Sequence, residues 1–225
     1  MRKITCLILS LVFMLIPILS LAYFQDEQIP TWSDSIETIS QIQNKTTLEL
    51  DSESAILLDE NSGTILYAKN EHARLRPASV TKVMTLLLVM EALDRGEISL
   101  DDRVLCSEKA RKMGGSQIWL NETEQLTVHE MLKAICVVSA NDCSVAIAEF
   151  IGGSEEMFVQ KMNEKAKELG MNDTTFKNCH GIDEDGHLTS AYDIALMSRE
   201  LSKNHPKIHE YTKIWMDSLR DGKSQ

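Results

Sequence analysis

Residues 76–94 read RPASVTKVMTLLLVMEALD, and this stretch decides the fold. After Pro77, apolar side chains recur on nearly every side of a helix, because the run from Val83 to Leu93 is almost wholly apolar. A helix without a polar face must be surrounded by other elements. We therefore expect it in the middle of a domain, and we expect Gly96 to end it.

Ser79 and Lys82 lie three positions apart at the start of this helix, so their side chains share one face. A serine hydroxyl becomes a nucleophile when a neighbouring base takes its proton, and burial lets a lysine serve as that base by favouring its neutral form. The apolar run after Lys82 should lower its pKa in this way. A structural alternative is that Ser79 caps the helix and Lys82 reaches from the helix end to solvent.

A second pair of polar residues, Ser139 and Asn141, strengthens the catalytic interpretation. Ser139-Ala140-Asn141 falls where one buried helix is expected to end and another to begin, so a hydroxyl and an amide stand on a constrained turn. Together the two elements predict an acyl-transfer site at Ser79, where the positive helix N-terminus would stabilise an oxyanion.

The segments around the long helix predict a hairpin before it and further helices after it. Residues 55–58 and 64–67 are apolar and flank the turn-forming Asn61-Ser62-Gly63, which is typical of two antiparallel strands. Later helices are expected at 127–139, 142–150, 154–169 and 191–201, the first opened by a Thr127–Glu130 capping box and the next two by Asp142 and Ser154. Gly152-Gly153 should close the second of these helices and Gly170 the third. A polar loop should span 178–190, and no closing element is evident over 211–225.

The amino-terminal residues predict export. Arg2 and Lys3 precede an apolar run from 4 to 22 that ends in Ser20-Leu21-Ala22, a small-residue cleavage pattern. We therefore divide the chain into a signal peptide over 1–22, a polar linker over 23–48 and a single partial catalytic domain over 49–225. The alternative is an uncleaved membrane anchor, and either segment would deliver the domain outside.

Composition excludes two classes of protein. The formal net charge of -11 argues against nucleic acid as a partner, because phosphate binding needs clustered Lys and Arg. Outside the signal, four cysteines remain without CxxC spacing, too few and too scattered for a disulfide scaffold: Cys106, Cys136, Cys143 and Cys179. We interpret them as buried free thiols, with a bridge among them as the alternative.

Four motifs make the chain resemble a known enzyme family. They are Arg76-Pro77-Ala78 with the Ser79 and Lys82 pair, Met113-Gly114-Gly115-Ser116, Ser139-Ala140-Asn141-Asp142, and Asn178-Cys179-His180-Gly181-Ile182-Asp183 with Gly186-His187. In these motifs the chain resembles the serine-type D-alanyl-D-alanine carboxypeptidases, which are low-molecular-mass penicillin-binding proteins that share the serine β-lactamase fold. The resemblance implies an α/β fold, a sandwich in which helices around the Ser79 helix pack on an antiparallel sheet.

The resemblance also implies a role for each motif residue. Ser79 would be acylated by the D-Ala–D-Ala terminus of a peptidoglycan stem peptide, with Lys82 as the base. Ser139 would relay a proton between Lys82 and the leaving amine, and Asn141 would hold the substrate amide. β-Lactams would acylate the same serine at the outer face of the bacterial cytoplasmic membrane. The membrane surface would be reached through an uncleaved signal or a missing carboxyl-terminal segment.

One family element, Lys-Thr-Gly on a strand, is absent from the sequence. Gly222-Lys223-Ser224-Gln225 does not replace it, and the resemblance places the real element beyond residue 225. We therefore expect a truncated sequence that encodes only the first hairpin of the sheet. Such a fragment should be nearly inactive, with an exposed patch on the long helix and an unpaired strand edge.

Three alternatives to a carboxypeptidase remain at this point. A β-lactamase of the same architecture and a non-catalytic penicillin- or peptidoglycan-binding remnant both fit the motifs. His180, Asp183, Asp185 and His187 could instead bind zinc, but no H-E-x-x-H helix supports a metal peptidase. We expect no metal and no other cofactor.

Overall fold

A computed structural model describes residues 48–222. The predicted signal peptide and nearly all of the predicted linker lie outside these residues, so the three segment boundaries stay predictions. The helices and strands of the described part all belong to a unit that begins at Asp51. Within residues 48–222, none of the helices combines the length and the apolar character that a membrane span requires.

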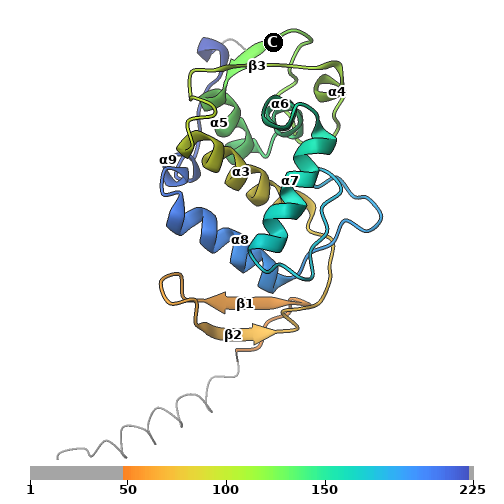
Figure 1. The fold of residues 1–225 in the computed structure, drawn as a ribbon, viewed down its shortest axis with the longest axis vertical. Helices are drawn as coiled ribbons and strands as arrows, with labels where there is room; N and C mark the ends of the chain where they lie inside the picture. Colours follow the sequence, from red (N-terminus) through yellow and green to blue (C-terminus); the bar gives the residue numbers. More distant parts are fainter. Residues whose placement is uncertain (1–47, 223–225) are drawn as a thin grey trace, which may run out of the picture. The chain divides into compact units, whose positions relative to one another are not determined.

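The hairpin predicted before the long helix is present. Strand β1 (Ala55–Leu58) pairs antiparallel with β2 (Ile65–Lys69), with an irregularity in register at Leu58. Gly63 has a φ of 75° in the connecting turn, a conformation that glycine adopts without strain. Helix α8 (Ala191–Asn204) lies beside the hairpin (Figure 1), and its Arg199 donates to the backbone carbonyls of Glu60 and Asn61.

The long helix occupies the centre of the described unit, as its all-round apolar sequence predicts. A 3-10 turn, η1 (Ala78–Thr81), leads directly into α3 (Lys82–Asp94), and Gly96 follows its end with a φ of 67°. Every side chain from Met84 to Met90 is buried. The exposed patch expected on this helix is therefore wrong, because α3 packs against α6, α7 and α8 within the same unit (Figure 1).

Three more helices follow in the predicted order. They are α5 (Val128–Val138), α6 (Asn141–Gly152) and α7 (Glu155–Glu168). The Thr127–Glu130 capping box opens α5 and Ser154 caps α7, as predicted. The prediction for Asp142 is wrong: Ala140 is the N-cap of α6, and the Asp142 carboxylate accepts hydrogen bonds from the backbone of the 118–120 loop instead.

Sequence patterns did not reveal a second small sheet and three short helical elements. Strands β3 (Arg103–Leu105) and β4 (Gln125–Thr127) pair antiparallel, and α4 (Glu108–Arg111) follows β3. The carboxyl-terminal part contains α9 (Ile208–Thr212) and η2 (Arg220–Gly222). It does close the unit, because Tyr211 is buried and Arg220 forms an ion pair with Glu124 at 2.5 Å.

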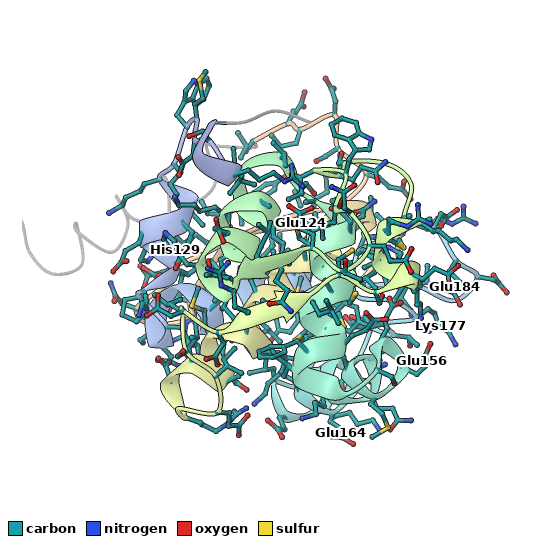
Figure 2. The ribbon with its side chains drawn as sticks, turned by 90° about the horizontal axis from the view of Figure 1, so that it is seen from above. Glu124, His129, Glu156, Glu164, Lys177 and Glu184 are labelled. Carbon is teal, nitrogen blue, oxygen red and sulfur yellow. The ribbon has the colours of Figure 1, made fainter. Side chains whose placement is uncertain are left out.

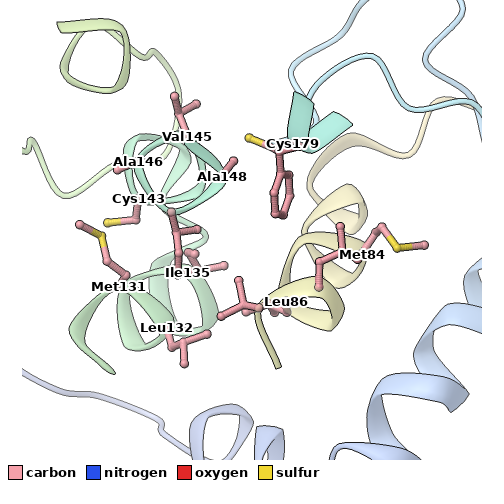
Figure 3. Close-up of a cluster of buried hydrophobic side chains, with 14 of the residues drawn as sticks. Met84, Leu86, Met131, Leu132, Ile135, Cys143, Val145, Ala146, Ala148 and Cys179 are labelled. Carbon is pink, nitrogen blue, oxygen red and sulfur yellow. The ribbon is translucent and has the colours of Figure 1, made fainter. Parts of the chain in front are cut away.

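The core lies between α3 on one side and α5 and α6 on the other (Figure 3). Leu86 of α3 faces Leu132 and Ile135 of α5 in this cluster (Figure 3). The four cysteines outside the predicted signal are free thiols, three of them buried and Cys136 half-buried, so the interpretation as unpaired thiols is confirmed. The described unit is a mixture of helices and small antiparallel sheets, in agreement with the expected α/β class.

Candidate active site

Ser79 and Lys82 contact each other at the start of the central helix. The Lys82 Nζ donates to the Ser79 Oγ at 3.2 Å. Ser79 lies inside η1, whose N-cap is Pro77, and it makes no capping hydrogen bond. The structural alternative in which Ser79 is an N-cap residue is therefore wrong. The Ser79 side chain is exposed, so a substrate has access to the hydroxyl.

Lys82 is buried rather than extended to solvent. Only 3% of its surface is exposed, and its Nζ donates a second hydrogen bond to the backbone carbonyl of His180 at 2.6 Å. Burial lowers the pKa of Lys82 to about 8, because the surrounding apolar core disfavours the ammonium form. The predicted direction of the pKa shift is confirmed. A neutral amine within reach of a serine hydroxyl is the arrangement that general-base activation requires.

Two unusual backbone positions bring the His180 segment against the turn that carries Ser79. Ala78 has a φ of 47° and Gly181 has a φ of 92°. A side chain at Gly181 would place its Cβ 1.8 Å from the carbonyl oxygen of Ala78, so the two backbones approach more closely than any other residue permits. Glycine at 181 thus lets the polar loop lie directly on the turn that carries Ser79.

Hydrogen bonds from η1 and α3 and within the loop itself fix the loop. Thr85 Oγ1 donates to the carbonyl of Cys179 at 2.7 Å, and the Asn178 side-chain oxygen accepts from the Gly181 N–H at 2.7 Å. Thr81 Oγ1 lies 2.7 Å from His187 Nε2. Since His187 Nδ1 accepts from a backbone N–H, the neutral ring carries its proton on Nε2 and donates it to Thr81.

These contacts include residues that sequence reasoning missed. Lys82 donates to the main-chain oxygen of His180, and a pattern of side chains in the sequence cannot predict such an acceptor. Thr81 and Thr85 did carry a signal, because they stand four positions apart and, apart from Lys82, are the polar residues of the run from 81 to 90, so both can contact the same neighbouring segment. We interpreted the loop only as polar, although its histidines are buried.

The geometry does not favour the zinc alternative. Both ring nitrogens of His187 are used by Thr81 and by the backbone, and Asp183 pairs with Arg76 at 2.5 Å. Burial lowers the pKa of His187, which keeps the ring neutral in these hydrogen bonds. Across residues 48–222, no three of the side chains that commonly bind metal gather at one place.

Ser139 and Asn141 lie at the junction of α5 and α6, as predicted. Ser139 is the C-cap of α5 and has a φ of 58°, a left-handed conformation that is uncommon for serine. Asn141 Nδ2 donates to the Gly114 carbonyl at 2.7 Å, and its backbone N–H donates to the Ser116 carbonyl at 2.7 Å. Among the hydrogen bonds of residues 48–222, none joins Ser139 to Lys82.

Helix α6, which begins at this junction, packs against α3, the helix that follows the turn carrying Ser79. The junction also gathers two of the quoted motifs in one place, because Asn141 holds the Gly114–Ser116 turn. A family model described as D-alanyl-D-alanine carboxypeptidase matches residues 40–224. The chain belongs to this family.

Individual D-alanyl-D-alanine carboxypeptidases share substantial sequence with this member. DacF from Bacillus subtilis (strain 168) is 54% identical over 179 residues, which cover 79% of this chain and 46% of that protein. The solved structure of penicillin-binding protein 6B from Escherichia coli has 34% identity and a TM-score of 0.75, over 80% of this chain and 58% of that one. These matches confirm the predicted family and its fold.

A further solved structure extends the comparison to a more distant relative. Penicillin-binding protein D2 from Listeria monocytogenes, in an ampicillin-bound form, has 28% identity and a TM-score of 0.70, over 79% of this chain and 72% of that one. The present carboxypeptidase-family chain spans about half the length of the curated relatives it matches. The expected Lys-Thr-Gly element beyond residue 225 stays a prediction.

Proposed function

We propose that this chain supplies the nucleophile of a D-Ala–D-Ala carboxypeptidase, which removes the terminal D-alanine from peptidoglycan pentapeptide stems through an acyl-enzyme on Ser79. The observation that carries the proposal is the 3.2 Å contact between Ser79 Oγ and the Nζ of a lysine that is 3% exposed. A buried lysine directed at an exposed serine supports the role of general base, because burial disfavours its ammonium form.

The proposed reaction begins with proton transfer from Ser79 to neutral Lys82. The Ser79 oxygen then attacks the penultimate D-alanine carbonyl, the peptide bond breaks, and the terminal D-alanine leaves with the proton returned to its amine. Water hydrolyses the resulting ester. The oxyanion of each step would lie near the amino-terminal end of the continuous η1 and α3 helix, where backbone N–H groups lack helical acceptors.

Ser139 and Asn141 take the two roles that the family motif assigns to them. We infer that Ser139 relays the proton between Lys82 and the leaving amine, supported by the strained conformation that holds it at the junction of two helices. Asn141 is held in place by the hydrogen bond from its Nδ2 to the Gly114 carbonyl. We infer that its Oδ1 accepts from the N–H of a substrate amide.

The proposed partners are peptidoglycan stem peptides and, as inhibitors, β-lactams. The ampicillin-bound relative supports the second, because a β-lactam acylates a serine by the same attack on a carbonyl. We further propose that the protein works outside the cytoplasmic membrane, on the strength of the apolar amino-terminal segment. Contact with the membrane surface through that segment is part of the same proposal.

A fluorescent penicillin tests the proposal directly. The purified chain should become covalently labelled, though slowly because the sequence lacks the Lys-Thr-Gly element, and should stay labelled over minutes; Ser79→Ala should abolish the label. Ser62→Ala, which removes a hydroxyl from the β1–β2 turn, is the matched control and should label normally. Rapid loss of label with hydrolysed penicillin would favour a β-lactamase, and an unlabelled chain that also releases no D-alanine would favour the non-catalytic remnant.

A further inference from the structure

A buried carboxylate lies behind the segment that holds Lys82. Glu155 is the first residue of α7 and exposes 6% of its surface. Its Oε1 accepts from the backbone N–H of Cys179 at 3.2 Å and lies 3.5 Å from Nε2 of His180. One side chain thus contacts both residues that immediately precede Gly181.

Lys109 of α4 provides the counter-ion. Its Nζ lies 2.9 Å from Glu155 Oε2 and 2.8 Å from Glu156 Oε1, so it spans a buried and an exposed acid. Burial by itself raises the pKa of Glu155, but the hydrogen bonds from Lys109 and Cys179 outweigh it and leave the pKa below its ordinary value. Glu155 is therefore an ionised group inside the core.

The His180 ring keeps a fixed, neutral form in this environment. Burial is the main reason that its pKa falls to about 4; Glu155 opposes the fall, whereas Lys82, His187 and Lys109 add to it. Nδ1 of His180 accepts from the Ile182 N–H at 3.1 Å, so Nε2 carries the proton and faces Glu155. The contact with Glu155 and the hydrogen bond from Ile182 therefore orient the His180 ring, and the hydrogen bond from the Cys179 N–H to Glu155 holds the adjoining backbone.

The same residue presents its carbonyl to the catalytic base. The His180 oxygen accepts from Lys82 Nζ at 2.6 Å, the shorter of the two hydrogen bonds that Lys82 makes. A chain of contacts consequently runs from the half-exposed Lys109 through Glu155 and His180 to Lys82. We propose that Glu155, with Lys109 as its counter-ion, is a positioning residue that fixes the His180 carbonyl beneath Lys82.

Capping and packing do not account for Glu155. Ser154 already caps α7, with its side chain accepting from the Met157 N–H. A buried ion pair adds little stability compared with an apolar pair of the same size, so stability alone does not explain it, and we infer that it orients the Cys179–His180 backbone. The proposal rests on the proposed function, in which Lys82 must take the Ser79 proton.

Two measurements on the 225-residue chain test the proposal. The first is the titration midpoint of the Lys82 amine, followed by NMR of ¹³Cε-labelled lysine and assigned with Lys82→Arg. The second is the rate of labelling by fluorescent penicillin between pH 6 and 9. The variants are Glu155→Gln, Glu155→Ala and Lys109→Met. Glu156→Gln is the matched control, because Glu156 lies at the surface (Figure 2) and shares Lys109 with Glu155.

The two charge changes should act in opposite directions. Glu155→Gln removes the negative charge that contacts Cys179 and His180 and should lower the Lys82 titration midpoint, whereas Lys109→Met leaves that charge uncompensated and should raise the midpoint. Glu155→Ala also frees the backbone of Cys179 and should slow labelling at high pH about tenfold. Glu156→Gln should leave the midpoint and the labelling rate unchanged.

The outcomes separate this proposal from the proposed function. Equal midpoints in the parent chain, Glu155→Gln and Lys109→Met would overturn the positioning role, as would an unchanged labelling rate in Glu155→Ala. A loss of labelling without a midpoint shift would indicate a packing defect and would also refute it. If the parent chain is never labelled but the midpoints shift as expected, the proposed function fails and the positioning of Lys82 stands.

Discussion

Replacing Gly181 by alanine should disable the site by a purely steric route. A Cβ at this position would lie 1.8 Å from the Ala78 carbonyl oxygen and 2.4 Å from its carbon, both backbone atoms. Real Cβ atoms essentially never approach a heavy atom within 3.0 Å, so the two segments must separate by about 1.2 Å. A movement of that size is large compared with the 2.6 Å distance between Lys82 Nζ and the His180 carbonyl oxygen, so it should break this hydrogen bond.

The expected size of the effect follows from that displacement. Misplacing a catalytic group by about 1 Å can cost about a hundredfold in rate. We therefore expect Gly181→Ala to slow penicillin labelling of Ser79 by about that factor. Stability should fall as well, by about 1–2 kcal/mol for an alanine at positive φ and by about 1–3 kcal/mol for the overlap.

Gly170→Ala is the matched control for this experiment. Gly170 also has a positive φ, 76°, but nothing lies within 4 Å of a Cβ built there. It should lose only the conformational part of the stability and should label at the normal rate. Urea denaturation and a time course of labelling measure the two quantities. Equal labelling of both variants would refute the close approach of residue 181 to the nucleophile turn.

Three further predictions concern the base, the 118–120 loop and a helix cap. Because burial lowers the pKa of Lys82 to about 8, its neutral fraction, and with it the labelling rate, should rise about fivefold from pH 7 to pH 8; a rate that is flat from pH 6 to 9 contradicts this. Asp142→Ala leaves the N–H groups of Ile118 and Leu120 without their acceptor and should cost about 1–3 kcal/mol in urea unfolding, and a cost near zero would mean that the loop finds other partners. Thr127→Ala should lower stability by about 1 kcal/mol through loss of the capping box, while Thr127→Ser should retain most of it, as compared by thermal melts.

The sequence predicted the elements that carry strong local signals. The capping box at Thr127, the Ser154 cap and the glycines at 96 and 170 marked helix ends that the molecule uses. The all-round apolar run after Lys82 placed α3 at the centre. The Ser79 and Lys82 contact was predictable for the same reason, since helical spacing alone brings the two side chains together.

The remaining features depend on partners that are distant in sequence. β3 and β4 are each three residues long and pair across some twenty residues, as in Val104 with Leu126, so neither shows a period of its own. Aspartate is a residue type typical of helix N-caps, which is why Asp142 was predicted to be one. Its carboxylate instead accepts hydrogen bonds from backbone N–H groups of the 118–120 loop, which is distant in sequence. The prediction of an exposed patch on α3 was wrong because it did not take into account α6, α7 and α8, which cover this helix.

The hydrogen bond from Lys82 to the His180 carbonyl has a consequence for how the site tolerates mutation. The acceptor is a main-chain oxygen, so no substitution at position 180 can delete it. Changes that reach it must alter the backbone path, through Gly181, or remove the side chains that hold that path, such as Asn178 and Thr85. Variants selected by an active-site inhibitor should accordingly arise around this loop more readily than at the base it supports.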